Sequence, residues 1–94
     1  MRISDVTAEY ALDYCGVSDA QETERINTCM TAAKAFILGY TGLDESNLDK
    51  YEDITAAYLV LINEMYTNRD YSVSIAGKNP LVRQILALHS VNYL

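Results

Sequence analysis

The chain has 94 residues, half of them hydrophobic, and its 13 acidic side chains against 7 basic ones give a formal net charge of −6. This length fits a single domain over residues 1–94, and the acidic balance argues against a protein that binds nucleic acid by neutralising phosphates over its whole surface. The amino terminus lacks the apolar core of a signal peptide, and no apolar run approaches the roughly 20 residues that span a bilayer, so we expect a soluble protein made in a cytoplasm, with no membrane partner.

A helical apolar pattern over about residues 7–15 predicts the first helix. Gly16 follows it, and a glycine there can adopt the left-handed conformation that ends a helix, with Val17 folded back as in a Schellman motif. The candidate N-caps of this helix are Ser4, Asp5 and Thr7. The second predicted helix opens at Ser18, because Gln21 completes a capping box three residues later. It ends between Gly39 and Gly42.

The connection that follows, residues 43–52, is polar and acidic. Leu48 is its expected anchor, and Asp49 or Asp53 is the expected cap of the next helix. That third helix is predicted over about Tyr51–Asn68. It is apolar around most of its circumference, which indicates burial on more than one side. Either it is the central helix of a compact bundle, or another copy of the protein covers part of it.

Residues 69–79 have the polar composition of a connecting arm. Asn79-Pro80 predicts the start of the last helix, since asparagine caps well and proline suits the first helical position. This helix is expected to run to about Tyr93. Its predicted apolar face consists of Leu81, Val82, Ile85, Leu86 and Leu88. The fold class is all-α, a compact bundle of about four helices with an extended loop or arm between the third and fourth.

The sequence offers little for catalysis or metal binding. Cys15 and Cys29 have no CxxC pair or clustered histidine near them, so we expect free thiols. His89 has no evident nucleophile partner and is expected to be a packed or surface histidine. The acidic connection lacks the spacing of a calcium loop. We therefore expect no enzyme, no cofactor and no metal site.

Four segments carry a family resemblance through their order and spacing over about Ala8–Leu88. They are Ala32-Ala33-Lys34-Ala35-Phe36-Ile37 with Tyr40-Thr41-Gly42-Leu43, then Ile54-Thr55-Ala56-Ala57, then Met65-Tyr66-Thr67-Asn68-Arg69, and finally Asn79-Pro80-Leu81-Val82. Together they resemble the short head-tail connector proteins of tailed bacteriophages, the connector and adaptor family whose members dock under the portal. The most specific pieces are the Tyr-Thr-Gly turn and the Tyr-Asn-Arg ending of the third helix.

The resemblance implies a structural protein of a phage or prophage virion, located at the head-tail interface and made in the host bacterial cytoplasm. It implies self-assembly into a ring of about twelve subunits beneath the portal protein, with a heterologous interface between neighbours. The ring would offer a docking platform to a stopper or tail-completion protein. Genome DNA would pass through the channel without sequence-specific binding.

Interaction residues are expected around the end of the third helix and in the arm. They are Tyr66, Asn68, Arg69, Tyr71, Val73, Ile75 and Lys78. The surplus apolar surface of the third helix is expected to supply much of the same contact. Arg69 is suited either to an intrasubunit brace or to an intersubunit bond with a carboxylate or helix-terminal carbonyls. Lys78 is either the cation that faces the channel or an ordinary solvated loop lysine.

Other functions remain open from the sequence. The main alternative is a small helical regulatory or nucleic-acid-binding protein, also encoded by a phage. Such a protein should present several basic and amide side chains on one exposed helix face, and no predicted helix does. An enzyme subunit or inhibitor is a third possibility, which predicts a single partner and not a ring.

Overall fold

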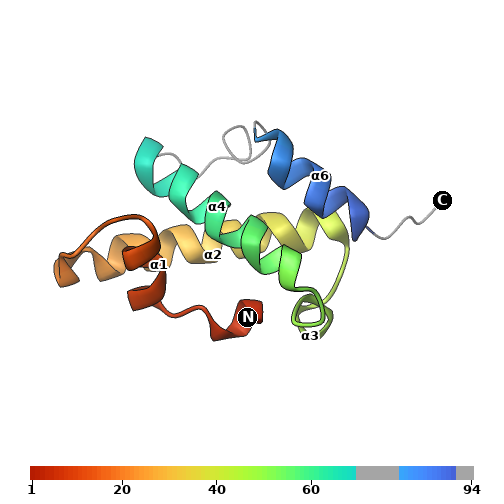
Figure 1. Ribbon diagram of the computed structural model, residues 1–94, viewed down its shortest axis with the longest axis horizontal. Helices are drawn as coiled ribbons and strands as arrows, with labels where there is room; N and C mark the ends of the chain where they lie inside the picture. Colours follow the sequence, from red (N-terminus) through yellow and green to blue (C-terminus); the bar gives the residue numbers. More distant parts are fainter. Residues whose placement is uncertain (70–78, 91–94) are drawn as a thin grey trace.

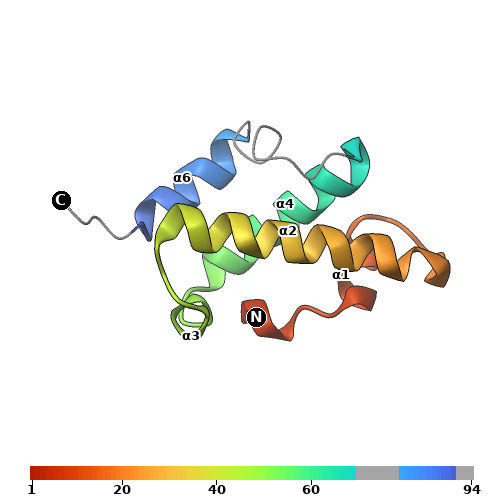
Figure 2. The same cartoon turned by 180° about the vertical axis from the view of Figure 1, so that it is seen from behind.

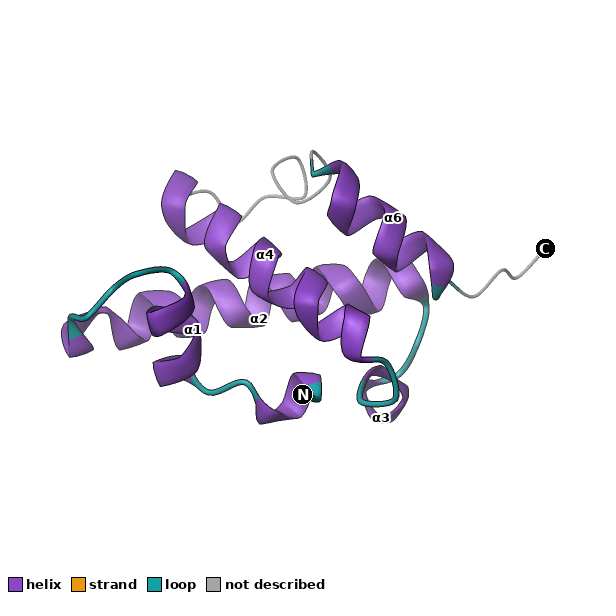
Figure 3. Ribbon diagram, viewed as in Figure 1, coloured by secondary structure: helices purple, strands orange, loops and turns teal. Residues whose placement is uncertain are grey.

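The computed structural model describes residues 1–69 and 79–90, and the described chain consists of helices joined by short turns (Figure 3). The helices are η1 (Ile3–Asp5), α1 (Ala8–Tyr14), η2 (Ala20–Glu22), α2 (Thr23–Thr41), α3 (Glu45–Leu48), α4 (Glu52–Asn68) and α6 (Pro80–Leu88). The all-α class predicted from the sequence is confirmed. The expected arm falls mainly on residues 70–78, which lie outside the described residues.

Two long helices, α2 and α4, cross at the centre of the molecule and make its most extensive helix contact (Figure 1). Helix α6 packs on α4 and on the end of α2, whereas α1 packs on the opposite part of the same pair. Seen from behind, α2 runs across the molecule with one face uncovered (Figure 2). The segment that carries η1 packs against α4 as well. Helix α4 therefore has neighbours on several sides.

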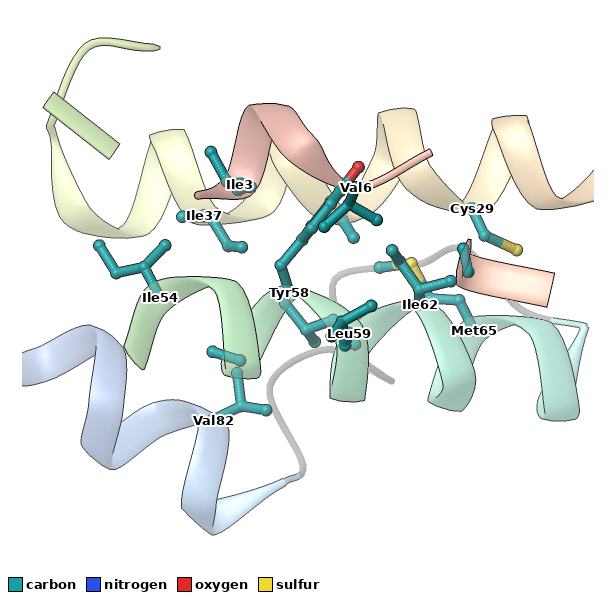
Figure 4. Packing of buried hydrophobic residues seen from close by; sticks show 14 of the residues in the cluster. Ile3, Val6, Cys29, Ile37, Ile54, Tyr58, Leu59, Ile62, Met65 and Val82 are labelled. Atoms are coloured by element: carbon teal, nitrogen blue, oxygen red, sulfur yellow. The ribbon is translucent and has the colours of Figure 1, made fainter. Parts of the chain in front are cut away.

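The core is built around α4. Its buried apolar side chains are Ile54, Ala57, Tyr58, Leu59, Leu61, Ile62 and Met65, and they meet Ile26, Cys29, Ala33 and Ile37 of α2. Figure 4 shows Tyr58 reaching from α4 toward Val6 of the amino-terminal segment, and burial raises the pKa of this phenol to about 12. Of the alternatives for this helix, the structure supports the central position in a compact bundle.

The expectation that α4 has surplus apolar surface is wrong for this structure. Neighbours from the same chain cover it, and its large aliphatic side chains are buried, with only Val60 half-buried. The described large apolar or aromatic side chains that remain exposed lie elsewhere: Met1, Tyr10, Tyr14, Tyr40, Leu81 and Leu88. Among the described residues, the exposed apolar surface therefore lies on the outer helices, at the amino terminus and on the uncovered side of α2.

Both ends of helix α1 have the caps that its sequence predicts. The Thr7 hydroxyl accepts a hydrogen bond from the Tyr10 backbone N–H at 3.1 Å, so Thr7 is the N-cap. Gly16 has a φ of 75°, and the Val17 N–H donates to the Leu12 carbonyl at 2.9 Å. This bond and the companion bond from Gly16 to the Asp13 carbonyl form the Schellman pattern.

The start of α2 differs from the prediction. Ser18 and Gln21 form no capping box; instead the Asp19 carboxylate accepts from the Gln21 N–H at 2.9 Å and begins the short helix η2. The α-helix proper starts at Thr23. The Asp19 carboxylate is a stronger hydrogen-bond acceptor than the Ser18 hydroxyl for the unpaired N–H groups of the first turn. The capping residue is therefore Asp19, one residue later than predicted.

The acidic connection contains the short helix α3, which the sequence did not predict. Asp44 is its N-cap and accepts from the Asn47 N–H at 3.0 Å. Leu48 is fully buried and anchors the connection as expected. The predicted caps of α4 are wrong, because Tyr51 stands at the N-cap without a side-chain bond, Asp49 binds Ser4, and Asp53 binds His89.

Helix α6 begins as predicted but ends early. The Asn79 side chain accepts from the N–H groups of Leu81 and Val82, and proline follows it. The helix ends at Leu88, and the predicted end at Tyr93 lies outside the described residues. Val82 and Leu86 are fully buried, whereas Leu81 and Leu88, both assigned to the apolar face from the sequence, are exposed.

Candidate functional site

The candidate site is the carboxyl end of α4, where the structure places three of the predicted interaction residues. Tyr66 is half-buried, and the Arg25 guanidinium carbon lies 5.9 Å from the centre of its ring. Arg25 also pairs with Glu22 at 3.4 Å. Burial raises the pKa of Tyr66, and the nearby Glu22 carboxylate raises that pKa further. Tyr66 therefore ties α4 to the start of α2 within one subunit.

Asn68 belongs to the last turn of α4. Its side-chain amide donates to the Glu64 carbonyl, one turn earlier in the same helix, at 2.7 Å. The Glu64 carboxylate in turn accepts from the Asn79 amide at 3.2 Å. Glu64 thus connects the end of α4 to the start of α6, and it was not singled out from the sequence because its partner lies fifteen residues away.

Arg69 ends α4 in an unusual conformation. Its φ of 54° is left-handed, and it is the one described residue other than glycine with a positive φ. A side chain with a Cβ costs roughly 1 kcal/mol there, and glycine is the usual residue. Arg69 is exposed, and residues 1–69 and 79–90 offer its guanidinium no carboxylate within 4.0 Å. An intrasubunit brace would need a partner outside the described residues.

The other predicted interaction residues are not brought into this site by the described structure. Tyr71, Val73, Ile75 and Lys78 lie outside the described residues. Their proposed roles in the arm, including the channel-facing role of Lys78, stay predictions. The described part of the site consists of Tyr66, Asn68 and Arg69 with the partners Glu22, Arg25 and Glu64.

A second polar cluster joins the other end of α4 to α6. His89 Nε2 lies 2.7 Å and 2.8 Å from the two carboxylate oxygens of Asp53, and its ring lies 4.1 Å from the Tyr51 ring centre to centre. The His89 side chain is 16% exposed, in line with the packed or surface histidine that the sequence suggested. The geometry fixes the end of α6 against the first turn of α4. No local signal could have revealed it, because Asp53 precedes His89 by 36 residues.

Three further observations concern the kind of site that these residues can form. Within residues 1–69 and 79–90, no group of three or more histidine, cysteine or acidic side chains is arranged to hold a metal ion. Cys15 and Cys29 are not joined in a disulfide. Among the described helices, none combines the length and the apolar character that crossing a membrane requires.

No protein-family model, curated protein or solved structure matches this chain.

Proposed function

We propose that the chain is a structural head-tail connector of a tailed phage or prophage, which joins a ring beneath the portal and around the DNA channel. The ring would give the stopper or tail its docking platform. One observation carries the proposal: the order and spacing of its four quoted segments resemble that family over most of the chain.

The Tyr-Thr-Gly turn, one of the two most specific pieces of the resemblance, has a defined structural role in this chain. The Thr41 hydroxyl donates to the Ile37 carbonyl at 2.7 Å and accepts from the Leu43 N–H at 3.3 Å. Gly42 follows with a φ of 73° and ends α2. The Tyr-Thr-Gly turn therefore directs the chain from α2 into the acidic connection.

Arg69 supports an interaction role for the other specific segment. A left-handed helix end favours glycine, yet this chain places there an exposed arginine whose charge has no described carboxylate partner. A planar guanidinium at the negative end of a helix is well placed to bind a carboxylate of a neighbouring subunit or of the portal. The intersubunit bond is therefore the reading that we propose for Arg69.

The charge of the chain suits a channel wall that DNA passes. A net charge of −6 disfavours tight binding of phosphates. DNA could then move past the ring without being held. A regulatory DNA-binding protein would need the opposite balance on at least one helix face.

The test is assembly with the portal protein of the same phage. Purified chain and portal are mixed and imaged by electron microscopy, and we expect a ring of added density beneath the portal. Arg69→Ala should reduce ring occupancy while leaving the melting temperature nearly unchanged, because alanine keeps the Cβ at the left-handed position. Lys50→Ala, which also removes an exposed cation, is the matched control. Absence of binding to the portal, together with salt-dependent binding to DNA, would replace the connector proposal by the regulatory one.

A further inference from the structure

The outer face of α6, here called the α6 face, is defined by Leu81, Gln84 and Leu88, and the exposed Arg83 lies at its edge. Leu81 is 55% exposed and Leu88 is 77% exposed, although both are large aliphatic side chains. Positions 81, 84 and 88 follow one another at helical spacing on one side, opposite the buried Val82 and Leu86. Arg83 is the one charged residue between Pro80 and Leu88. The α6 face thus combines two exposed leucines with Gln84, and a single positive charge lies at its edge.

The outer face of α1, here called the α1 face, has the complementary character. It presents Glu9, Tyr10, Asp13 and Tyr14, all of them exposed, and α1 contains no basic residue. Beside it is a hollow of about 330 Å³. Leu12 and Val17 give this hollow apolar walls.

Among residues 1–69 and 79–90, no cation pairs with the acidic side chains of this region. Glu9 and Asp13 are four residues apart on a helix, where like charges destabilise the helix by about 0.2–0.5 kcal/mol. Asp19, which also lines the hollow, adds a third carboxylate. Within the described residues, no ion pair reaches Glu9, Asp13 or Asp19. A cation from outside the subunit would relieve this repulsion.

The two faces belong to helices at opposite ends of the molecule. Figures 1 and 2 both show α1 beside the first half of α2 and α6 beside its last turns. One subunit therefore cannot bring its own α6 face onto its own α1 face. Two different surfaces at opposite ends are what a heterologous, head-to-tail contact between copies requires.

We infer that the α6 face of one copy docks onto the α1 face of a second copy. In this contact Leu88 lies against the apolar walls of the hollow, and Arg83 lies toward the carboxylates of Glu9 and Asp13. The inference deepens the proposed function, because it names the surfaces through which neighbouring subunits meet. That these subunits form a ring rests on the proposed function. A second copy is the favoured occupant because the chain itself supplies both the acidic apolar hollow and the positively charged apolar helix face.

The contact is tested by sedimentation of the full chain over a concentration series up to about 1 mM, a range that detects weak association. We expect concentration-dependent association that Leu88→Asp abolishes. Ala35→Asp, which adds the same charge at an exposed position of α2, is the matched control and should associate like the parent chain. Circular dichroism checks that each variant is folded.

A charge swap tests the partners directly. Asp13→Arg and Arg83→Asp should each lower the association constant about three- to tenfold, since a pair at the rim of a contact changes from attraction to repulsion. The chain that carries both substitutions should recover most of the lost association constant. In every contact between two such chains, the introduced aspartate at position 83 of one copy then faces the introduced arginine at position 13 of the other, so the attraction is restored with the charges exchanged. Failure of the double variant to recover overturns the inference.

Two other outcomes would also overturn the inference. One is a chain that stays monomeric at every concentration, and the other is a Leu88→Asp variant that associates like the parent chain. Failure of the connector proposal is a separate result, since it is measured with the portal present. A chain that associates through these faces but ignores the portal keeps the contact and loses the proposed function.

Discussion

Helices α4 and α6 are both rich in apolar residues, yet the first is covered and the second is not. Helix α4 packs against α2, α1, α6 and η1, so its aliphatic side chains are buried on several sides. Helix α6 packs mainly on α4 and α2, and it leaves Leu81 and Leu88 in solvent. The difference shows that the number of neighbours, more than the apolar content of a helix, decides where this chain offers surface to a partner.

Truncating one leucine in each helix should give the largest difference in stability between α4 and α6. Leu61→Ala in α4 should lower the free energy of unfolding by about 3 kcal/mol, because it leaves a cavity at a fully buried position. Leu88→Ala in α6 should cost less than about 0.5 kcal/mol, as expected of an exposed position. Urea denaturation of the isolated subunit measures both. Similar losses for the two variants would contradict the contrast between the helices.

The N-cap residue Asn79 attaches the start of α6 to α4. Asn79→Ala removes an N-cap that accepts from two backbone N–H groups and donates to Glu64, so we expect a loss of about 1–2 kcal/mol. Asn79→Ser keeps a capping oxygen and loses the amide bond to Glu64 without adding a charge beside that carboxylate, so it should cost less. Thermal unfolding monitored by circular dichroism separates them. Equal melting temperatures for the parent and Asn79→Ala would show that the cap does not hold α6.

Substitutions at the two left-handed helix ends, Gly42 and Arg69, should change the free energy of unfolding in opposite directions. Gly42→Ala places a Cβ at a φ of 73° and should destabilise the subunit by about 1 kcal/mol. Arg69→Gly removes a Cβ at a φ of 54° and should stabilise it by up to about 1 kcal/mol. Chemical denaturation gives both values. A destabilised Arg69→Gly would mean that the arginine side chain braces its own subunit after all.

The smallest expected effect concerns the segment that covers α4 from the amino terminus. Ser4 donates its backbone N–H and its hydroxyl to the Asp49 carboxylate, and these bonds hold the pKa of Asp49 below its usual value. A lowered folded-state pKa means that the stabilisation is complete above the ordinary carboxyl pKa and is lost as the pH falls through the folded-state value. Asp49→Asn should therefore flatten the loss of stability below about pH 4.

Asp13→Asn is the control for that measurement, because Asp13 has no ion pair among the described residues. Melting temperatures recorded from pH 6 down to acid conditions test the pair of variants. An Asp49→Asn profile that matches the parent chain at every pH would show that the Ser4 contact does not contribute.

Local signals in the sequence predicted the helix ends well where the partner is close in the chain. Gly16 with Val17 and Asn79 with Pro80 act as expected, because these caps use groups within five residues. The sequence failed where partners are distant. Asp49 and Asp53 look like N-caps, but Ser4 and His89 lie 45 and 36 residues away and bind them instead.

The candidate site was predictable only in part, for the same reason. Tyr66 and Arg69 stand out because they end a long apolar helix, but the contact of Tyr66 with Arg25 depends on how α2 crosses α4. Leu81 and Leu88 recur at a helical spacing, and so do the buried Val82 and Leu86, which lie a fraction of a turn away around the helix. Which stripe faces inward is set by the position of α6 on α4, which periodicity does not contain.

Native mass measurement of the portal protein mixed with this chain tests the central claim most directly. We expect the portal ring to gain the mass of multiple copies of the chain, and to gain fewer copies when Leu88→Asp replaces the parent. A portal whose mass stays unchanged in an excess of folded chain would contradict the account.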